Sequence, residues 1–264
     1  MPQPLSKISP DAQFELSTTA LVDRPDLANL VTQIFALWAV VEQEFQILFS
    51  RIVGPDEIVA DAVYAILTSE GLQRTALNAA AKAKFGTDSE EFEVFSAVLA
   101  VYKRAGKIRH KLAHWRWGKS PDLPDALLLA APTDVKLVSL TGSYMRTIEP
   151  LDGEKRPERT ARILKHVAFD ISKILVYRAK DLEEGLAEIG QALQALTNFD
   201  LFINPATTEE RAEELKRLMG PQFEKAINVG TSAEALRRLS TLSLFQEARA
   251  QLSRGNRKNP RPPT

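Results

Sequence analysis

The sequence predicts a mainly α protein: an antiparallel helical bundle with a small inserted β-ribbon and a C-terminal helical extension. Two stretches, at about residues 25–53 and 90–115, carry apolar side chains at alternating steps of four and three. That spacing is typical of a helix that packs along one face. Two shorter helical stretches lie between them, which favours an antiparallel bundle. The 264 residues, 44% of them hydrophobic, suffice for one large domain, with or without an extension.

The first long helix is predicted from about Pro25 to Val53, after an extended or loosely docked arm at residues 1–24. The arm is polar and has three prolines among its first ten residues. The packing face of the helix consists of Leu27, Val31, Ile34, Trp38, Val41, Phe45, Leu48 and Ile52. Leu30, Leu37 and Phe49 widen this face, so we expect the helix to be buried on more than one side.

Two shorter helices are predicted next, at about residues 56–69 and 71–85. Gly54-Pro55 separates them from the first helix, because proline cannot continue a helix. The second of them is rich in alanine, and Gly86 ends it.

A fourth, long helix follows. Thr87 and Glu90 have the spacing of a capping box, which marks its beginning. Its packing face consists of Val94, Val98, Val101, Ala105, Ile108, Leu112 and Trp115. These four helices form the predicted bundle, which spans residues 25–118.

The pattern changes after Gly118, and residues 119–177 are predicted to form a β-ribbon and a charged loop. We expect Pro121 and Pro124 to close the preceding helix. The predicted strands are the short apolar or β-branched stretches 126–131, 135–140 and 144–148. Pro132-Thr133-Asp134 and Gly142-Ser143 separate them. The segment Ile174–Tyr177 fits both a further strand and the start of a helix.

The C-terminal extension, residues 178–255, is predicted to be helical. Its helices are expected at about residues 181–199, 207–219 and 232–252. Asp181 can cap the first of them, and its apolar face consists of Leu182, Leu186, Ile189, Leu193 and Leu196. The polar tail, residues 256–264, is predicted to be disordered.

Composition excludes several classes of protein. The chain carries 34 basic and 34 acidic side chains, so its formal net charge is zero, which argues against a wholly basic protein that coats DNA. The absence of cysteine removes disulfides, thiolate catalysis and cysteine-ligated zinc. No apolar run reaches about 18 residues, and the N-terminus lacks the layout of a secretion signal. We therefore expect no membrane span and a cytoplasmic location.

Positive charge is concentrated in one run of the chain. Residues 103–119 carry seven Lys or Arg and no Asp or Glu, and Lys107–Gly118 holds two of the three histidines and two of the three tryptophans. Histidine can act as acid or base near neutral pH, and arginine can stabilise charge on a phosphorane. Together they suffice for metal-free RNA cleavage, so RNA is the predicted partner.

Four side chains of this run are predicted to contact RNA: Lys107, Lys111, Arg116 and Trp117. Cationic side chains hold the phosphate backbone, and a tryptophan can stack on an unpaired base. Trp115 shares the apolar helix face with Leu112, so a role in the core fits it better than stacking.

The hexapeptide Arg109-His110-Lys111-Leu112-Ala113-His114 resembles the R-x4-6-H signature of the HEPN superfamily, whose arginine is commonly followed by a polar residue. Its position late in a long bundle helix agrees, and the resemblance covers roughly residues 26–118. It implies a HEPN-like helical bundle that forms homodimers. Many members are metal-independent endoribonucleases, which act as toxins of toxin–antitoxin pairs or in phage defence.

By this resemblance, Arg109 and His114 would be catalytic, and His110 would be the supporting polar residue. The enzyme would need no metal and no other cofactor. Attack by the 2′-hydroxyl would leave a 2′,3′-cyclic phosphate and a 5′-hydroxyl. An antitoxin or another regulatory protein would be a further partner.

Helix geometry constrains this site. Arg109 and His114 are five residues apart, which places them about 140° apart around an ideal helix. They converge within one chain only if the helix ends or bends near Leu112, and otherwise the site must be shared across a dimer. Glu42, in the first helix, is the predicted supporting acid that pairs with Arg109 and orients it. Glu44 is expected to be solvated.

The sequence also admits other interpretations. His114 can simply satisfy a last carbonyl at the negative end of its helix. His110 and His114 share one helix face, as a metal pair would, but no Asp or Glu lies between Glu93 and Asp122, so no metal site is expected. The chain can also be a non-catalytic HEPN-like module that binds RNA, a nucleotide or a protein, or a structural protein that interacts through its C-terminal region.

Overall fold

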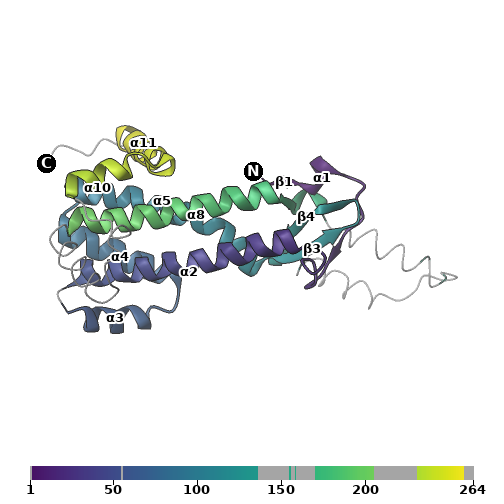
Figure 1. Cartoon of the computed structure of the whole chain (residues 1–264), viewed down its shortest axis with the longest axis horizontal. Coiled ribbons are helices and arrows are strands. Elements are labelled where there is room, and N and C mark those ends of the chain that lie inside the picture. The colour runs from purple at the N-terminus through teal and green to yellow at the C-terminus, as the bar shows by residue number, and fades with distance from the viewer. Residues whose placement is uncertain are drawn as a thin grey trace, which may run out of the picture. The chain divides into compact units, whose positions relative to one another are not determined.

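The protein is mainly helical, with a small antiparallel sheet (Figure 1). The computed structural model describes residues 2–54, 56–135, 155, 158, 170–204 and 231–258. The helices among these are α1 Leu5–Ile8, α2 Pro25–Val53, α3 Glu57–Ile66, α4 Glu70–Phe85, α5 Glu90–His114, α8 Ala179–Ile203, α10 Ser232–Leu239 and α11 Ser243–Lys258. The strands are β1 Gln3–Pro4, β2 Glu15–Leu16, β3 Arg116–Ser120, β4 Leu123–Ala130 and β5 Ile174–Arg178.

The chain divides into two compact units. Unit 1 comprises residues 1–35 and 107–186, and unit 2 comprises residues 36–106 and 187–264. The division falls inside the long helices α2, α5 and α8, whereas the sequence pattern placed its boundaries between helices.

Unit 1 contains a five-stranded sheet with the strand order β1-β5-β4-β3-β2, in which all neighbours are antiparallel. Part of residues 1–24, predicted to form an extended or loosely docked arm, belongs to this sheet. β1 pairs with β5 and β2 pairs with β3, so the N-terminal segment forms both edges of the sheet. Leu5 is fully buried and packs with Leu128 and Val176 in the core on one face of the sheet. This packing holds the segment in place.

The predicted ribbon is confirmed only in its first stretch, which forms most of β4. The partners of β4 come from elsewhere: β3 lies directly behind α5, and β5 precedes α8, which settles Ile174–Tyr177 as a strand. α5 ends at His114 rather than at the two prolines, because residues 116–120 pair with β4. Residues 132–135 are helical. The predicted stretches at 136–140 and 144–148 lie outside the described residues.

The buried residues of α2 follow its predicted face in both units. All eight residues of the α2 face are buried along the helix, and the predicted bounds of α2 are confirmed. Trp38 and Phe45 lie 5.1 Å and 4.4 Å from Tyr102 of α5 between ring centroids. Burial in this aromatic cluster raises the pKa of the Tyr102 phenol. α3 and α4 lie close to their predicted ranges.

Local hydrogen bonds correct the predicted starts of two helices. Ser89, not Thr87, caps α5, since its Oγ accepts from the backbone N–H of Phe92 at 3.1 Å. α8 begins two residues before Asp181, which lies inside its first turn and accepts from the N–H of Arg178 at 3.1 Å. Both acceptors satisfy N–H groups that a helix start leaves unpaired.

The C-terminal region holds two helices, α10 and α11, where a single helix at 232–252 was predicted. The chain breaks at residues 240–242, where hydroxyls compete for helix carbonyls. Ser240 Oγ donates to Leu236 O at 2.9 Å, and Thr241 Oγ1 donates to Arg238 O at 2.7 Å. Residues 256–258 belong to α11 rather than to a disordered tail. The predicted helix at 207–219 lies outside the described residues.

Candidate functional site

The C-terminal end of α5, in unit 1, is fixed by contacts on several sides. Leu112 is buried, and Ile108 packs against Gly185 of α8, where any Cβ would collide with it. The indole Nε1–H of Trp117 donates to the carbonyl oxygen of Leu112 at 2.9 Å. This bond satisfies a carbonyl that the helix end leaves open. The end of α5 is therefore a rigid platform for the side chains that it exposes.

Four basic side chains share one face of this platform. Lys107, His110, Lys111 and His114 follow at steps of three, one and three, which places them on one stripe of a helix. We call them the α5 basic face. The two histidine ring centroids are 4.7 Å apart, and both side chains are exposed. His114 makes no side-chain hydrogen bond within the described residues, so the carbonyl-capping role comes from Trp117 instead.

Lys111 connects this face to an aromatic side chain. Its Nζ lies 5.1 Å from the ring centroid of Trp115, a cation–π contact. Burial, and second the charge of Lys107, lower the pKa of the Lys111 ammonium. A half-buried cation next to another cation is an arrangement that an anionic ligand would stabilise.

Arg109 does not share a helix face with His114. α5 stays helical through His114, and the N–H of Trp115 still bonds to Lys111 O at 2.9 Å. The helix therefore does not end near Leu112, which was one condition for the two side chains to converge in one chain. The predicted angle of about 140° between them holds for a regular helix.

Arg116 and Trp117 lie on strand β3, not on a continued helix. Neighbouring residues of a strand point to opposite faces; accordingly Arg116 is exposed and Trp117 is half-buried. Trp117 pairs with Leu129 of β4. The indole N–H of Trp117 is already engaged by the carbonyl oxygen of Leu112.

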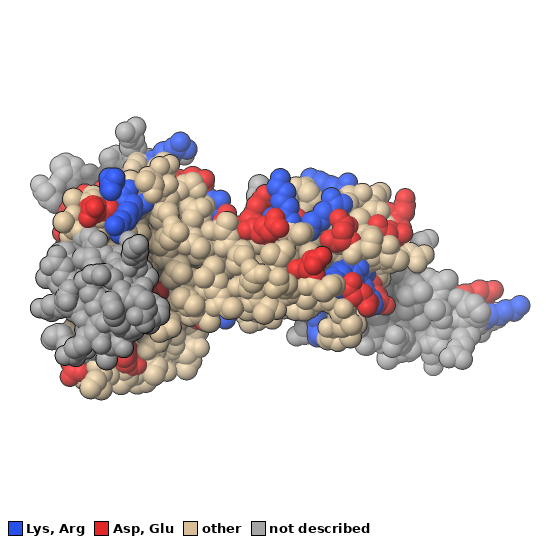
Figure 2. All heavy atoms as spheres, in the orientation of Figure 1, with Lys and Arg blue, Asp and Glu red and all other residues tan. Residues whose placement is uncertain are grey.

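The seven cations of residues 103–119 differ in their partners. Arg104 bonds to Glu188 at 2.9 Å and also to Glu247, and Lys119 bonds to Glu15 at 3.1 Å. Lys107, Lys111 and Arg116 have no carboxylate partner among the described residues. Figure 2 shows basic and acidic side chains intermixed on the face that it displays. An anion would therefore be attracted by the few basic side chains near it and not by a large basic surface.

This difference leads to a prediction on RNA binding. Lys107→Ala should lower the slope of log affinity against log salt by about one, because each phosphate contact releases counterions. Arg104→Ala, a matched loss of one charge from the same helix, should leave the slope unchanged, because its guanidinium is held by two carboxylates. Titrations of RNA at several salt concentrations measure both slopes. Equal changes in both variants would contradict a role specific to the α5 basic face.

Glu42, the predicted supporting acid, lies in unit 2. Its Oε1 accepts a hydrogen bond from the Trp38 indole at 2.7 Å, which ties it to the aromatic cluster. Its pairing with Arg109 stays a prediction. Within the part of the chain that the structure describes, no three His, Asp or Glu side chains gather as metal ligands would.

A pocket of about 480 Å³ opens beside the end of α5. We call it the α5-end pocket. Its lining consists of Leu16, Ser17, Thr18, Leu112, Ala113, Trp115, Arg116, Trp117 and Val135. Leu16, Ser17 and Thr18 come from the N-terminal segment, for which the sequence predicts an arm. The sequence therefore did not reveal this pocket. Arg116 and Trp117, two of the side chains predicted to contact RNA, are part of its lining.

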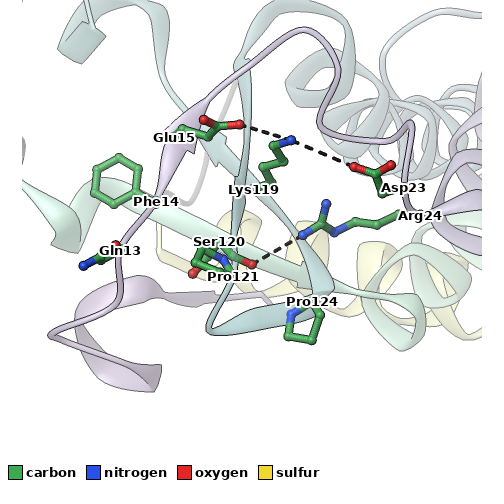
Figure 3. Close-up of a pocket in the computed structure, with 9 residues that line it drawn as sticks. All are labelled: Gln13, Phe14, Glu15, Asp23, Arg24, Lys119, Ser120, Pro121 and Pro124. Atoms are coloured by element: carbon green, nitrogen blue, oxygen red, sulfur yellow. Dashed lines mark hydrogen bonds and ion pairs between the residues drawn. The ribbon is translucent and has the colours of Figure 1, made fainter.

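A second pocket in unit 1, of about 490 Å³, lies at the start of α2 (Figure 3). Lys119 Nζ is placed between the carboxylates of Glu15 and Asp23, at 3.1 Å and 4.0 Å. The Arg24 guanidinium donates to the carbonyl oxygens of Ala20 and Ser120, at 3.0 Å and 3.4 Å. The charge of Lys119 is thus balanced by two carboxylates, and the Arg24 guanidinium is bound to backbone carbonyl oxygens.

The chain matches no protein-family model, no curated protein and no solved structure. No helix among the described residues is long and apolar enough to span a membrane.

Proposed function

We propose that the chain is a metal-independent endoribonuclease of HEPN type, acting as a toxin or phage-defence effector. The α5 basic face carries this proposal. It presents two exposed histidines, 4.7 Å apart between ring centroids, beside lysines that lack carboxylate partners in the described residues. Histidines can transfer protons near neutral pH, and unpaired lysines favour phosphate. A HEPN-like bundle is the fold that this proposal implies for the helical part.

In the proposed reaction, His114 takes the proton of a 2′-hydroxyl as that oxygen attacks the adjacent phosphorus. Arg109 stabilises the negative charge of the phosphorane, and His110 positions the reacting groups. The bond to the 5′-oxygen breaks, and this oxygen takes up a proton from solvent water, while His114 returns its proton to the solvent. The products are a 2′,3′-cyclic phosphate and a 5′-hydroxyl, and no metal or cofactor takes part.

The proposed enzyme works as a homodimer. A single continuous helix holds Arg109 and His114 on different faces, so a complete site needs Arg109 from one chain and His114 from the other. Exposed apolar side chains support self-association: Ile58 and Ile66 of α3 are 82% and 75% exposed.

The same geometry favours a second candidate function. If the chain acts alone, the separation of Arg109 and His114 leaves a phosphate-binding face without a catalytic pair. The protein would then be a non-catalytic HEPN-like module that binds RNA, a nucleotide or a regulatory protein such as an antitoxin. It would bind through the same basic face and cut nothing.

Complementation tests the shared site. Arg109→Ala and His114→Ala chains, each inactive alone, are co-expressed with different affinity tags and purified through both tags. Every mixed dimer keeps one of two composite sites, so about half of the wild-type cleavage activity should return. The matched control pairs Arg109→Ala with a chain carrying both substitutions, and should stay inactive. Mixed dimers that form but do not cut would contradict the shared site.

A further inference from the structure

Aromatic and aliphatic side chains form much of the lining of the α5-end pocket. Trp115 and Trp117 line it together with Leu16 and Leu112. The indole of Trp117 is held by its bond to Leu112 O, so this wall is fixed before any ligand arrives. A volume of about 480 Å³ falls within the range of small-molecule sites, roughly 300–1,000 Å³. The pocket therefore suits a planar, largely apolar group.

Polar groups lie at defined points of the same pocket. The N–H of Ser17 bonds to Trp117 O at 2.9 Å, which holds the N-terminal segment against β3. The Thr18 hydroxyl is exposed and has no hydrogen-bond partner among the described residues. A hydroxyl can donate to or accept from the edge of a nucleobase. Arg116 adds an exposed cation that suits a phosphate.

The pocket adjoins the α5 basic face. Ala113 and Trp115, both in its lining, flank His114 in the chain, and Lys111 of the basic face contacts the Trp115 ring. A nucleotide whose phosphate lies on the basic face can thus reach the pocket with its base. A base paired in a duplex cannot enter, because its faces are covered by its stacked neighbours.

We infer that the α5-end pocket binds one unpaired nucleobase of single-stranded or bulged RNA, next to the phosphate held by the α5 basic face. This inference rests on the proposed RNA binding and narrows its substrate class. Stacking on the indole rings supplies affinity for any base, and the Thr18 hydroxyl lies where it can contact the edge of that base.

The test compares two single strands of equal length: 2′-fluoro RNA, which this reaction cannot cut, and a strand with the same backbone but no bases. Fluorescence anisotropy measures the affinity of the full-length protein for each. Wild type should bind the base-bearing strand roughly 5- to 150-fold more tightly, since stacking of one base contributes about 1–3 kcal/mol. Thr18→Trp, which fills the pocket from its rim, should remove this preference. Thr32→Trp, at an exposed position of α2 outside the pocket, should keep it.

The outcomes separate the two proposals. Equal binding of both strands by wild type would overturn the base pocket and leave phosphate binding by the α5 basic face standing. A preference that survives in Thr18→Trp would also overturn it. Binding of neither strand would overturn the RNA proposal and the pocket together. If Thr18→Trp fails to fold, the comparison of the two nucleic-acid strands with wild type still tests the base pocket.

Discussion

His114→Ala is expected to lower the rate of RNA cleavage in EDTA by about 10²- to 10⁴-fold, the usual contribution of a general acid or base. The side chain is exposed at the end of α5 and makes no side-chain hydrogen bond within the described residues, so its loss should leave the fold intact. Purified wild type and variant, incubated with total RNA, give the ratio of rates. Expression from a tight promoter should likewise be toxic only for wild type.

Comparison variants separate catalysis from structure. His110→Ala should reduce cleavage less, because it positions groups rather than transferring the proton. If His114 only stabilised the negative end of α5, its removal would cost about 0.3–1 kcal/mol of stability and leave cleavage unchanged. Equal cleavage by wild type and His114→Ala would contradict the assigned mechanism.

Trp38→Ala should lower the free energy of unfolding by about 3–5 kcal/mol, as expected for a large buried aromatic side chain. The side chain is 1% exposed and contacts Tyr102. Its ring also fills the space above Gly106, where a Cβ would lie 2.9 Å from Cη2. Truncation therefore leaves a cavity in unit 2. It also removes the indole N–H that donates a hydrogen bond to the Glu42 carboxylate.

Urea unfolding, followed by circular dichroism, measures this loss. Val40→Ala is a matched control two residues away on α2, because Val40 is 43% exposed. It should change stability by no more than about 0.5 kcal/mol. Similar losses for both variants would show that the aromatic cluster is not the centre of the unit 2 core.

The helices were predictable because their signal is local. The apolar spacing of α2 predicted its bounds and its buried face, and the same kind of spacing located α5, on which His110 and His114 were expected to share a face. The break between α10 and α11 was missed because Ser240 and Thr241 act through hydroxyl bonds that periodicity does not register.

The sheet and the pocket were not predictable in this way, because they depend on pairing between distant segments. Strands of two residues, such as β1 and β2, carry no periodic signal of their own. One residue did hold a clue. A Cβ at Gly118 would lie 2.7 Å from Glu15 O, and an isolated glycine in a strand often marks a close backbone approach. That approach brings residues 16–18 against Trp117 and forms the pocket.

The chemistry of the RNA ends produced in EDTA tests the central claim most directly. Removal of a proton from the 2′-hydroxyl by His114 predicts fragments with a 2′,3′-cyclic phosphate and a 5′-hydroxyl, formed by wild type and not by His114→Ala. Fragments with a 3′-hydroxyl and a 5′-phosphate, or cleavage that appears only when a divalent metal is added, would contradict it.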